Sequence, residues 1–336
     1  MDEVADLVIQ VEQVVTPVYL VGGTVRDVLQ GVKTADLDFA TPLLPDQVEV
    51  LVKLAGLHPH TVGKRFGTVG FTLSGYQVEV TTFRTEKYLA GSRKPEVEFV
   101  TDITHDLGRR DFTVNAMAWR KGKLIDPYGG QADLATKTIR AVGPAGERFR
   151  EDPLRVLRAA RFVAQLGFNL DPATAKAATS HATQILEVSK ERWVQELDKL
   201  LLSPQVSSGL QALADTRLLT VMLPELALQV EYDQHSPYHE LDLWEHTKRV
   251  VVGVPADLTL RWAALLHDIG KPFVRVEKPD RSTYAQHELI GRELVLKIGQ
   301  YLRWSKKRIA AVAQLVSDHM QPDSPLHAAD TAAKRA

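Results

Sequence analysis

The chain has 336 residues, of which 25% are charged and 44% are hydrophobic, and its formal net charge is −1. The length predicts two or three domains, and the composition is that of a globular protein with enough apolar residues for a core. The sequence excludes two kinds of feature and disfavours a third. No apolar run reaches the roughly 18 residues of a membrane span. The absence of cysteine rules out disulfides and thiolate metal sites, and the charge argues against a uniformly basic nucleic-acid coat.

The location predicted from these features is the cytoplasm. Residues 1–6 are acidic and unlike the basic leader of a signal peptide. The absence of cysteine fits a reducing compartment. Basic residues still gather in short groups that leave room for a local nucleic-acid groove: Lys64–Arg65, Arg93–Lys94, Arg109–Arg110 and Lys306–Arg308.

The first part of the chain predicts a head that mixes strands and helices. Short β-rich runs predict extended segments at residues 18–21, 68–73, 76–81, 96–100 and 123–126. Ser74–Gly75, between two of these runs, is a hairpin signal. Helices are expected over residues 47–54 and over residues 24–30, where Gly31 is a C-terminal stop.

From about residue 150 the pattern becomes helical, and strand signals nearly vanish. Long stretches rich in Ala, Leu, Glu, Lys and Arg follow one another. Asp152–Pro153 and Asp171–Pro172 are each an N-cap residue followed by a proline at the first helical position, and Ser189 opens a further helix. We therefore predict an α+β fold, in which a mixed-sheet head is followed by an all-α region.

Asp36 and Asp38 are the candidate metal ligands of the head. Their two-residue spacing in an extended segment puts both carboxylates on one face of a strand. Glu79, in another predicted strand, is a candidate third carboxylate. With the Gly22–Gly23 turn as a phosphate cradle, this set predicts metal-dependent chemistry on a nucleoside triphosphate. On spacing alone, a turn or capping role for Asp36 has about equal weight.

Two further clusters carry arginine. Residues 109–116 begin with Arg109–Arg110, whose guanidinium forks suit triphosphate oxygens; the alternative is a surface salt-bridge patch in which Asp111 pairs locally. In residues 151–162, arginines follow the Asp152 cap at intervals of three. At the start of this helix, the Asp152 carboxylate and the guanidinium groups of Arg155, Arg158 and Arg161 can present acceptors and donors to the edge of a base. The alternatives are a solvated helix face for the arginines and a simple cap for Asp152.

Together these clusters resemble the bacterial (class II) tRNA nucleotidyltransferases and poly(A) polymerases. The resemblance runs in order from residue 22 to residue 197. It lies in Gly22-Gly23-x-Val25-Arg26-Asp27, Asp36-x-Asp38, Arg109-Arg110-Asp111-Phe112-Thr113-x-Asn115-Ala116, Glu151-Asp152-Pro153-Leu154-Arg155-x-Leu157-Arg158 and Glu191-Arg192-x-x-x-Glu196-Leu197.

The resemblance implies a polymerase-β-like head. It implies Mg²⁺ at Asp36 and Asp38, and triphosphate contacts at Gly22, Gly23, Arg26 and Arg110. It further implies that Asp152 and Arg155 pair with the incoming base and that Arg158 and Arg161 assist. Glu191 and Arg192 are expected to support this helix, and an ordinary helix-surface pair is the alternative, with about equal weight apart from the resemblance.

The implied activity is template-independent addition of CCA to the 3′ end of tRNA, with CTP and ATP as substrates and pyrophosphate as the product. A poly(A) polymerase and a partial, CC- or A-adding enzyme are alternatives, because they share the head. The loop around residues 84–95 looks intact, whereas it is shortened in relatives that add only CC; this favours competence for A addition. Within it, residues 90–95 are a candidate gate, and a plain connection is the alternative.

The last third of the chain carries a series of histidines. Residues 265–271, Leu-Leu-His-Asp-Ile-Gly-Lys, resemble the signature of HD phosphohydrolases, in which helices supply His and Asp ligands to a divalent metal. Adjacent residues cannot chelate as an i, i+4 pair does, so other helices must contribute. The implied set is His246, His267, Asp268, His287 and either Asp318 or His319, of which we name His319.

We accordingly expect three domains. The head covers residues 1–143, a helical neck and body for base and tRNA binding covers 144–225, and an HD-type domain covers 226–336. Residues 328–336 read as a frayed or truncated end. An HD-domain phosphohydrolase with its own divalent metal, to which the head adds only RNA binding, is the alternative from a second class of enzyme.

Overall fold

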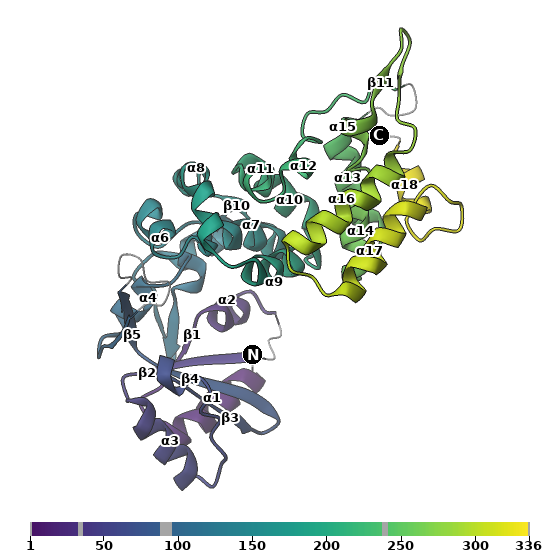
Figure 1. The fold of residues 1–336 in the computed structure, drawn as a ribbon. Coiled ribbons are helices and arrows are strands. Elements are labelled where there is room, and N and C mark those ends of the chain that lie inside the picture. Colours follow the sequence, from purple (N-terminus) through teal and green to yellow (C-terminus); the bar gives the residue numbers. More distant parts are fainter. Residues whose placement is uncertain (1, 33–35, 88–95, 237–240, 335–336) are drawn as a thin grey trace. The chain divides into compact units, whose positions relative to one another are not determined.

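The computed structural model describes residues 2–32, 36–87, 96–236 and 241–334 (Figure 1). The chain divides into two compact units, residues 1–151 and 152–336. None of the helices in the described ranges is long and apolar enough to cross a membrane. Most of the predicted loop at residues 84–95 lies outside the described residues, including the candidate gate.

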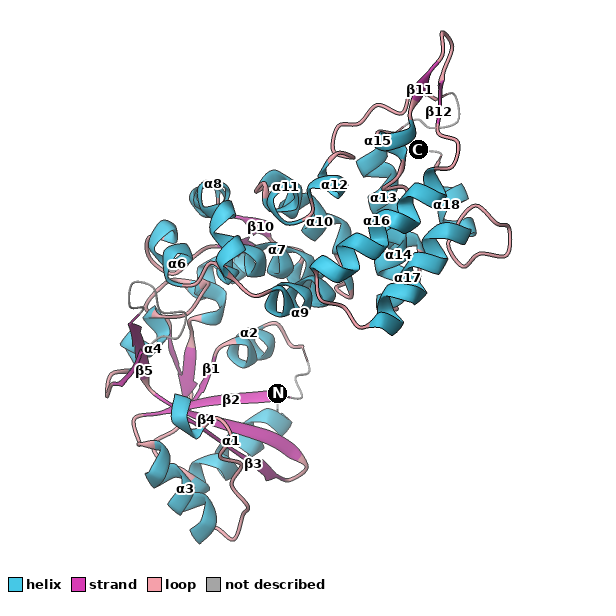
Figure 2. Ribbon diagram, in the orientation of Figure 1, coloured by secondary structure: helices cyan, strands magenta, loops and turns pink. Residues whose placement is uncertain are grey.

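The first unit is built on a mixed sheet of six strands in the order β3-β4-β2-β1-β7-β8 (Figure 2). Strands β2 and β4 are parallel, and the other neighbouring pairs are antiparallel. The strands are β1 (Tyr19–Val21), β2 (Asp36–Thr41), β3 (Thr68–Leu73), β4 (Tyr76–Thr82), β7 (Ala118–Arg120) and β8 (Lys123–Ile125). Ser74 and Gly75 both have positive φ, which confirms the predicted hairpin between β3 and β4.

One face of this sheet is covered by two helices, α1 (Asp2–Val14) and α3 (Pro45–Leu54) (Figure 2). Alternate residues of β2 and β4 are buried against these helices, and burial of each such side chain contributes about 1.5–3 kcal/mol. The buried set includes Val11, Leu37, Phe39, Val48, Val78 and Val80. The residues between them in β2 and β4 therefore emerge on the opposite face.

The remaining elements of the first unit connect and flank the sheet. They include the predicted helix after the glycine pair and an antiparallel pair of strands, β5 and β6. Their bounds are α2 (Gly23–Leu29), η1 (Lys64–Phe66), β5 (Arg84–Lys87), β6 (Glu96–Phe99), α4 (Ile103–Gly108), η2 (Thr113–Asn115), α5 (Gly130–Ala135), β9 (Thr138–Ile139) and α6 (Ala145–Glu151).

The second unit is almost entirely helical, as predicted. Its first half contains α7 (Leu154–Leu166), β10 (Asn169–Leu170), α8 (Pro172–His181), η3 (Ala182–Glu187), α9 (Lys190–Leu201), α10 (Val206–Asp215), α11 (Leu218–Met222) and α12 (Pro224–Ala227). Its second half contains α13 (Leu243–Gly253), α14 (Leu258–Leu266), α15 (Lys271–Val274), β11 (Val276–Glu277), β12 (Ser282–Thr283), α16 (His287–Tyr301), α17 (Lys306–Asp318) and α18 (His327–Ala333).

Two details of the second unit differ from the sequence-based expectation. Helix α7 begins one residue later than predicted, yet the Asp152 carboxylate still accepts a hydrogen bond from the Leu154 N–H at 3.1 Å. The antiparallel hairpin of β11 and β12 was not predicted at all. Its strands have only two residues each, which is too short for an alternating pattern to be recognised.

Helix α9 contacts helices α14 and α17 through Asp198. Its carboxylate accepts a hydrogen bond from Trp262 Nε1 at 2.7 Å and two from the Arg308 guanidinium at 2.6 and 3.0 Å. The Trp262 and Trp304 rings pack edge to face, with centroids 4.8 Å apart. These contacts join the body helices and the histidine-bearing helices into one compact unit.

Candidate functional site

The exposed face of the head sheet carries Asp38 and Glu79. They are register partners on the parallel strands β2 and β4, and both side chains are exposed. The Asp38 N–H lies 3.2 Å from Thr24 Oγ1, which attaches β2 to helix α2. Asp36 opens β2 with Gln77 as its register partner, and only the backbone of Asp36 is described. Two of the three predicted carboxylates thus lie on neighbouring strands, on the face without helices α1 and α3.

The glycine turn beside β2 is lined by two arginines. Gly22 has φ +70°, and a Cβ placed there would lie 2.6 Å from Arg110 Nη1, so both its backbone conformation and its surroundings require glycine. Arg26, which is buried, donates from Nη1 to Asn115 Oδ1 at 2.7 Å. Arg110 Nη1 lies 3.4 Å from the Asn115 carbonyl oxygen. The predicted triphosphate residues therefore gather around one turn, together with Gly23.

A buried carboxylate that sequence reasoning missed holds the arginine pair. Asp106 accepts hydrogen bonds from Arg109 Nε at 2.9 Å and from Arg110 Nη2 at 3.2 Å. Burial acts to raise the pKa of Asp106, but the two guanidinium groups outweigh it and the pKa is lowered. Asp111, the partner considered from the sequence, instead accepts from the Phe112 N–H at 2.8 Å. The missed signal was an i, i+3 and i, i+4 spacing on helix α4.

The arginine stripe of helix α7 is not a solvated face. Arg155 and Arg161 are buried, and Arg161 Nε lies 2.6 Å from Glu196 Oε2 of helix α9. Arg158 Nη1 is 3.6 Å from the same carboxylate. Glu196 is only 5% exposed, so it supplies buried negative charge to two arginines.

Of the two residues predicted to support helix α7, one does so. Arg192 donates to Asp152 Oδ2 at 3.3 Å. Glu191 instead follows the alternative of an ordinary surface pair, because it forms an exposed pair with Arg303 at 2.8 Å. Its place is taken by Glu196, one turn and a half further along helix α9, which faces helix α7 instead of the solvent.

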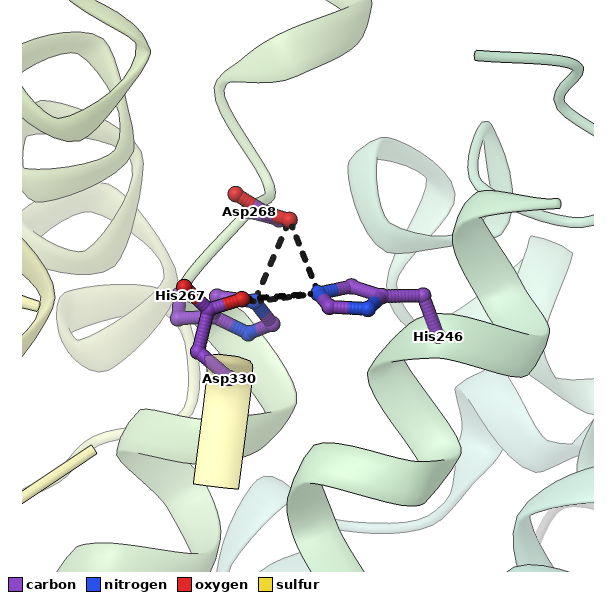
Figure 3. A group of neighbouring side chains, drawn as sticks. All are labelled: His246, His267, Asp268 and Asp330. Atoms are coloured by element: carbon purple, nitrogen blue, oxygen red, sulfur yellow. Dashed lines mark hydrogen bonds and ion pairs between the residues drawn. The ribbon is translucent and has the colours of Figure 1, made fainter. Parts of the chain in front are cut away.

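The five predicted histidine and aspartate ligands converge in the second unit. Figure 3 shows His246, His267, Asp268 and a fourth residue, Asp330, pointing toward one another. His246 lies in α13, His267 and Asp268 directly follow α14, and Asp330 lies in α18. His287 and His319, from α16 and the end of α17, form a second group with the same Asp268. All six side chains are buried.

The histidine tautomers suit metal binding. In three of these rings, Nδ1 lies 2.7 to 2.8 Å from the backbone carbonyl oxygen three residues earlier: His267 on Ala264, His287 on Tyr284 and His319 on Val316. A carbonyl oxygen can only accept, so each Nδ1 carries a hydrogen, and Nε2 is the atom with which each ring can bind a metal. The donor set therefore fits a divalent metal.

Asp268 stands between the two groups of ligands. Its Oδ2 lies 3.1 Å from His267 Nε2 and 3.4 Å from His246 Nε2. Its Oδ1 lies 3.2 Å from His287 Nε2 and 3.7 Å from His319 Nε2. Burial acts to raise the pKa of Asp268, but His267 and Lys271 outweigh it and hold the pKa well below its usual range. The buried carboxylate is thus ionised.

Asp330 was missed from the sequence. Its Oδ1 lies 3.1 Å from His246 Nε2, and the histidine outweighs the effect of burial, so the pKa of Asp330 is lowered. No motif marks it, because it stands alone in an alanine-rich segment read as a frayed end. Asp318, the alternative to His319, bonds instead to Gln314 at 2.6 Å and lies outside both groups. Burial lowers the pKa of His319 to about 4, so its ring is neutral at pH 7.

Comparison with known proteins identifies the class. Residues 18–140 match the family described as the poly A polymerase head domain. Residues 167–229 match the probable RNA and SrmB-binding site of polymerase A, and residues 239–336 match the HD domain. The fold is that of a nucleotidyltransferase head joined to a helical, HD-type region. The chain belongs to the tRNA nucleotidyltransferase family, which includes the CCA-adding enzymes.

Individual relatives support this assignment. The chain is 41% identical over 268 residues to a CCA-adding enzyme of Geobacillus thermodenitrificans, across 77% of this chain and 62% of the relative. It is 36% identical over 314 residues to an A-adding tRNA nucleotidyltransferase of Deinococcus radiodurans, across 90% of this chain and 68% of the relative. The first three curated relatives are matched over only 51–62% of their own length.

A solved structure gives the same result for the fold. The crystal structure of the Bacillus stearothermophilus CCA-adding enzyme in complex with CTP is similar with a TM-score of 0.67 and 31% identity. The similarity covers 99% of this chain and 81% of that chain. The predicted family and the predicted α+β fold with an HD-type region are therefore confirmed.

Proposed function

We propose that this chain adds CCA to the 3′ end of tRNA, using CTP and ATP. The tRNA 3′-hydroxyl attacks the α-phosphate, the bond to the leaving pyrophosphate breaks, and the hydroxyl proton passes to solvent. The observation that carries this proposal is the register pairing of Asp38 with Glu79, on the open face of the sheet next to the Gly22 turn. The carboxylate groups of Asp36 and Asp38 would hold Mg²⁺, which neutralises phosphate charge and activates the hydroxyl.

The two arginines at the glycine turn bind the triphosphate. Each is held in place before the nucleotide arrives, Arg26 by Asn115 and Arg110 by Asp106. A guanidinium group that is already positioned loses little side-chain entropy on binding, and its charge is permanent. Gly22 lets the backbone approach the phosphates because it carries no side chain.

Asp152 and Arg155 read the base of the incoming nucleotide, assisted by Arg158 and Arg161. The Asp152 oxygens already accept from the Leu154 N–H and from Arg192. A carboxylate has about four acceptor sites, so capping helix α7 and accepting from a base are compatible roles. Glu196 holds Arg158 and Arg161 and is a positioning residue.

The reaction is tested on three tRNAs: one that lacks CCA, one that ends after the first C and one that ends after CC. With labelled CTP or ATP, we expect products that are completed to CCA in each case and no further. Long A tails would point to a poly(A) polymerase, and addition of CC or A alone would point to a partial enzyme. No incorporation in the presence of Mg²⁺ contradicts the proposal.

We propose the cytoplasm as the location. We also propose that the boundaries at residues 143 and 225 separate the head, the neck and body, and the HD-type domain.

A second activity is supported by the histidine and aspartate cluster. We propose that His246, His267, Asp268 and Asp330 hold a divalent metal, and that His287 and His319 share Asp268 in the same centre. The three Nδ1–carbonyl hydrogen bonds support this, because they direct the Nε2 lone pairs inward. A metal held by these residues would supply Lewis-acid chemistry for the activation of water and of a phosphate ester. In the hydrolysis, a water oxygen bonds to phosphorus, the ester P–O bond breaks, and the leaving alcohol takes a proton.

This second proposal is tested with the full chain and with a double variant, His267→Ala with Asp268→Ala. We expect the unaltered chain to contain divalent metal and to hydrolyse phosphate esters, and the double variant to lose both properties. Incorporation of CTP into tRNA should persist in the double variant. A metal-free unaltered chain with no phosphatase or phosphodiesterase activity contradicts the second proposal and leaves the first in place.

A further inference from the structure

A cavity of about 450 Å³ opens beside the histidine and aspartate cluster. It is bordered by cluster residues, namely Asp268, His287 and Asp330. It is also bordered by cationic side chains from three different elements, namely Lys271, Arg281 and Lys334. The volume lies within the range of pockets that bind small molecules, and it is too small for folded RNA.

Two of these cations are already paired with carboxylates of the cluster. Lys271 Nζ lies 2.7 Å from Asp268 Oδ2 and donates to Gln234 Oε1 at 3.0 Å. Lys334 Nζ lies 3.1 Å from Asp330 Oδ2. Each lysine thus balances the charge of an aspartate, and neither is the main source of positive charge for a ligand.

Arg281 differs from both lysines. Among the described residues, none forms a hydrogen bond or an ion pair with its guanidinium group. Its backbone is nevertheless fixed, because the Arg281 carbonyl accepts from the Lys278 N–H at 2.9 Å and the Ser282 N–H donates to the His235 carbonyl at 2.7 Å. The hairpin of β11 and β12 therefore holds a permanently charged, half-buried fork at the cavity wall.

We infer that this cavity binds a phosphate ester no larger than a single nucleotide, and that Arg281 binds its phosphoryl oxygens. Guanidinium groups bind phosphate oxygens bidentately, and residues of the buried cluster line the same cavity. The inference rests on the hydrolase function proposed above and names its substrate class and a specificity residue. The nucleotide is free or forms the terminus of an RNA chain, since both present the same phosphate.

The inference is tested by binding, with the full chain and isothermal titration calorimetry. The probes are inorganic phosphate, uridine 3′-phosphate and a short oligouridine with a terminal 3′-phosphate. We expect Arg281→Met to weaken the binding of phosphate at least about tenfold, and Arg281→Lys to weaken it less, since charge is kept but the fork is lost. Binding of both nucleotide probes indicates that the cavity accepts the terminus of an RNA chain. Binding of the mononucleotide alone indicates that the ligand is a free nucleotide.

Lys278→Met is the matched control, because Lys278 lies on the same hairpin, is exposed and does not line the cavity. It should bind phosphate like the unaltered chain. Equal affinity in Arg281→Met and the unaltered chain, or no binding of any probe by the unaltered chain, overturns the inference. Metal analysis of the same samples separates the two proposals: an unaltered chain without metal counts against the hydrolase, while the effect of Arg281→Met on phosphate binding still decides the inference.

Discussion

Asp38 and Glu79 occupy the same register position on the parallel strands β2 and β4, and both point away from the buried core of the head. Register partners on neighbouring strands have side chains on the same face, a few ångströms apart. Two carboxylates so close repel each other unless a cation lies between them or they remain solvated. This relationship is consistent with the cation site proposed above on the open face of the sheet.

Replacing Asp38 with Asn should reduce the incorporation of labelled CTP into tRNA by at least about a hundredfold. The amide removes the charge but keeps the shape, and the side chain is exposed, so the melting temperature should change little. Glu147→Gln is the control, since Glu147 is an exposed carboxylate of the same unit on helix α6. Normal incorporation by Asp38→Asn would contradict the assignment of the metal site.

Gly22→Ala should raise the KM for CTP and ATP. The new Cβ would lie 2.6 Å from Arg110 Nη1 and displace that guanidinium, and the backbone at φ +70° and ψ −139°, a region that residues other than glycine rarely adopt, adds roughly 1–3 kcal/mol of strain. Gly31→Ala is a matched control, because Gly31 also has φ +70° but has no atom within 4 Å of the added Cβ. Both variants carry strain from a positive φ, and only Gly22→Ala should bind triphosphate more weakly. Equal KM values in the two variants would refute the role of Arg110.

Glu196→Gln should destabilise the second unit by roughly 3–5 kcal/mol, because it leaves the buried Arg161 without its charged partner. It should also reduce discrimination between correct and incorrect nucleotides. Glu191→Gln, on the same helix, is the control: its pair with Arg303 is exposed, so urea unfolding should be unchanged. If Glu191→Gln were less stable than Glu196→Gln, Glu196 would not be the residue that holds helix α7.

The head should lose stability in acid through Asp106. Because the folded-state pKa of this carboxyl group lies below its ordinary value of 3.8, the ion pairs contribute fully above that pH. The contribution is lost as the pH falls from about 4 toward the lowered pKa. The protection of helix α4 against hydrogen exchange, corrected for the intrinsic exchange rate at each pH, should therefore fall below pH 4, and Asp106→Asn should show low protection already at pH 7. Exchange in Asp106→Asn that matches the unaltered chain at pH 7 would contradict this account.

Metal binding separates Asp330 from Asp318. Asp330→Asn should lower the affinity of the second unit for divalent metal by about 10- to 100-fold, because it removes a buried anion beside His246. Asp318→Asn should leave the affinity unchanged, since that carboxylate bonds to Gln314 outside the cluster. Chelation should lower the melting temperature of the unaltered chain, because the metal binds only the folded state. Equal metal content in both variants would exclude Asp330 as a ligand.

Much of the head could be predicted because its signals are local. The strands of the β3–β4 hairpin, the turn at Ser74–Gly75 and the helix after Gly22 were recognised from residues adjacent in the chain. The alternation of buried and exposed residues in β2 is likewise a local property of extended backbone. Helix α7 was also predicted, although it begins at Leu154 and not at Pro153.

The sequence by itself determined the kinds of element, the order of the motifs and, through the resemblance that they carry, the family. Only the tertiary structure decided which charged residues meet. It paired Arg110 with Asp106 and Arg161 with Glu196, and it brought Asp330 to the histidines of α13 and α14. The reason is physical: backbone periodicity acts over a few residues, whereas the position of a ligand on a distant helix depends on how the helices pack around a common core.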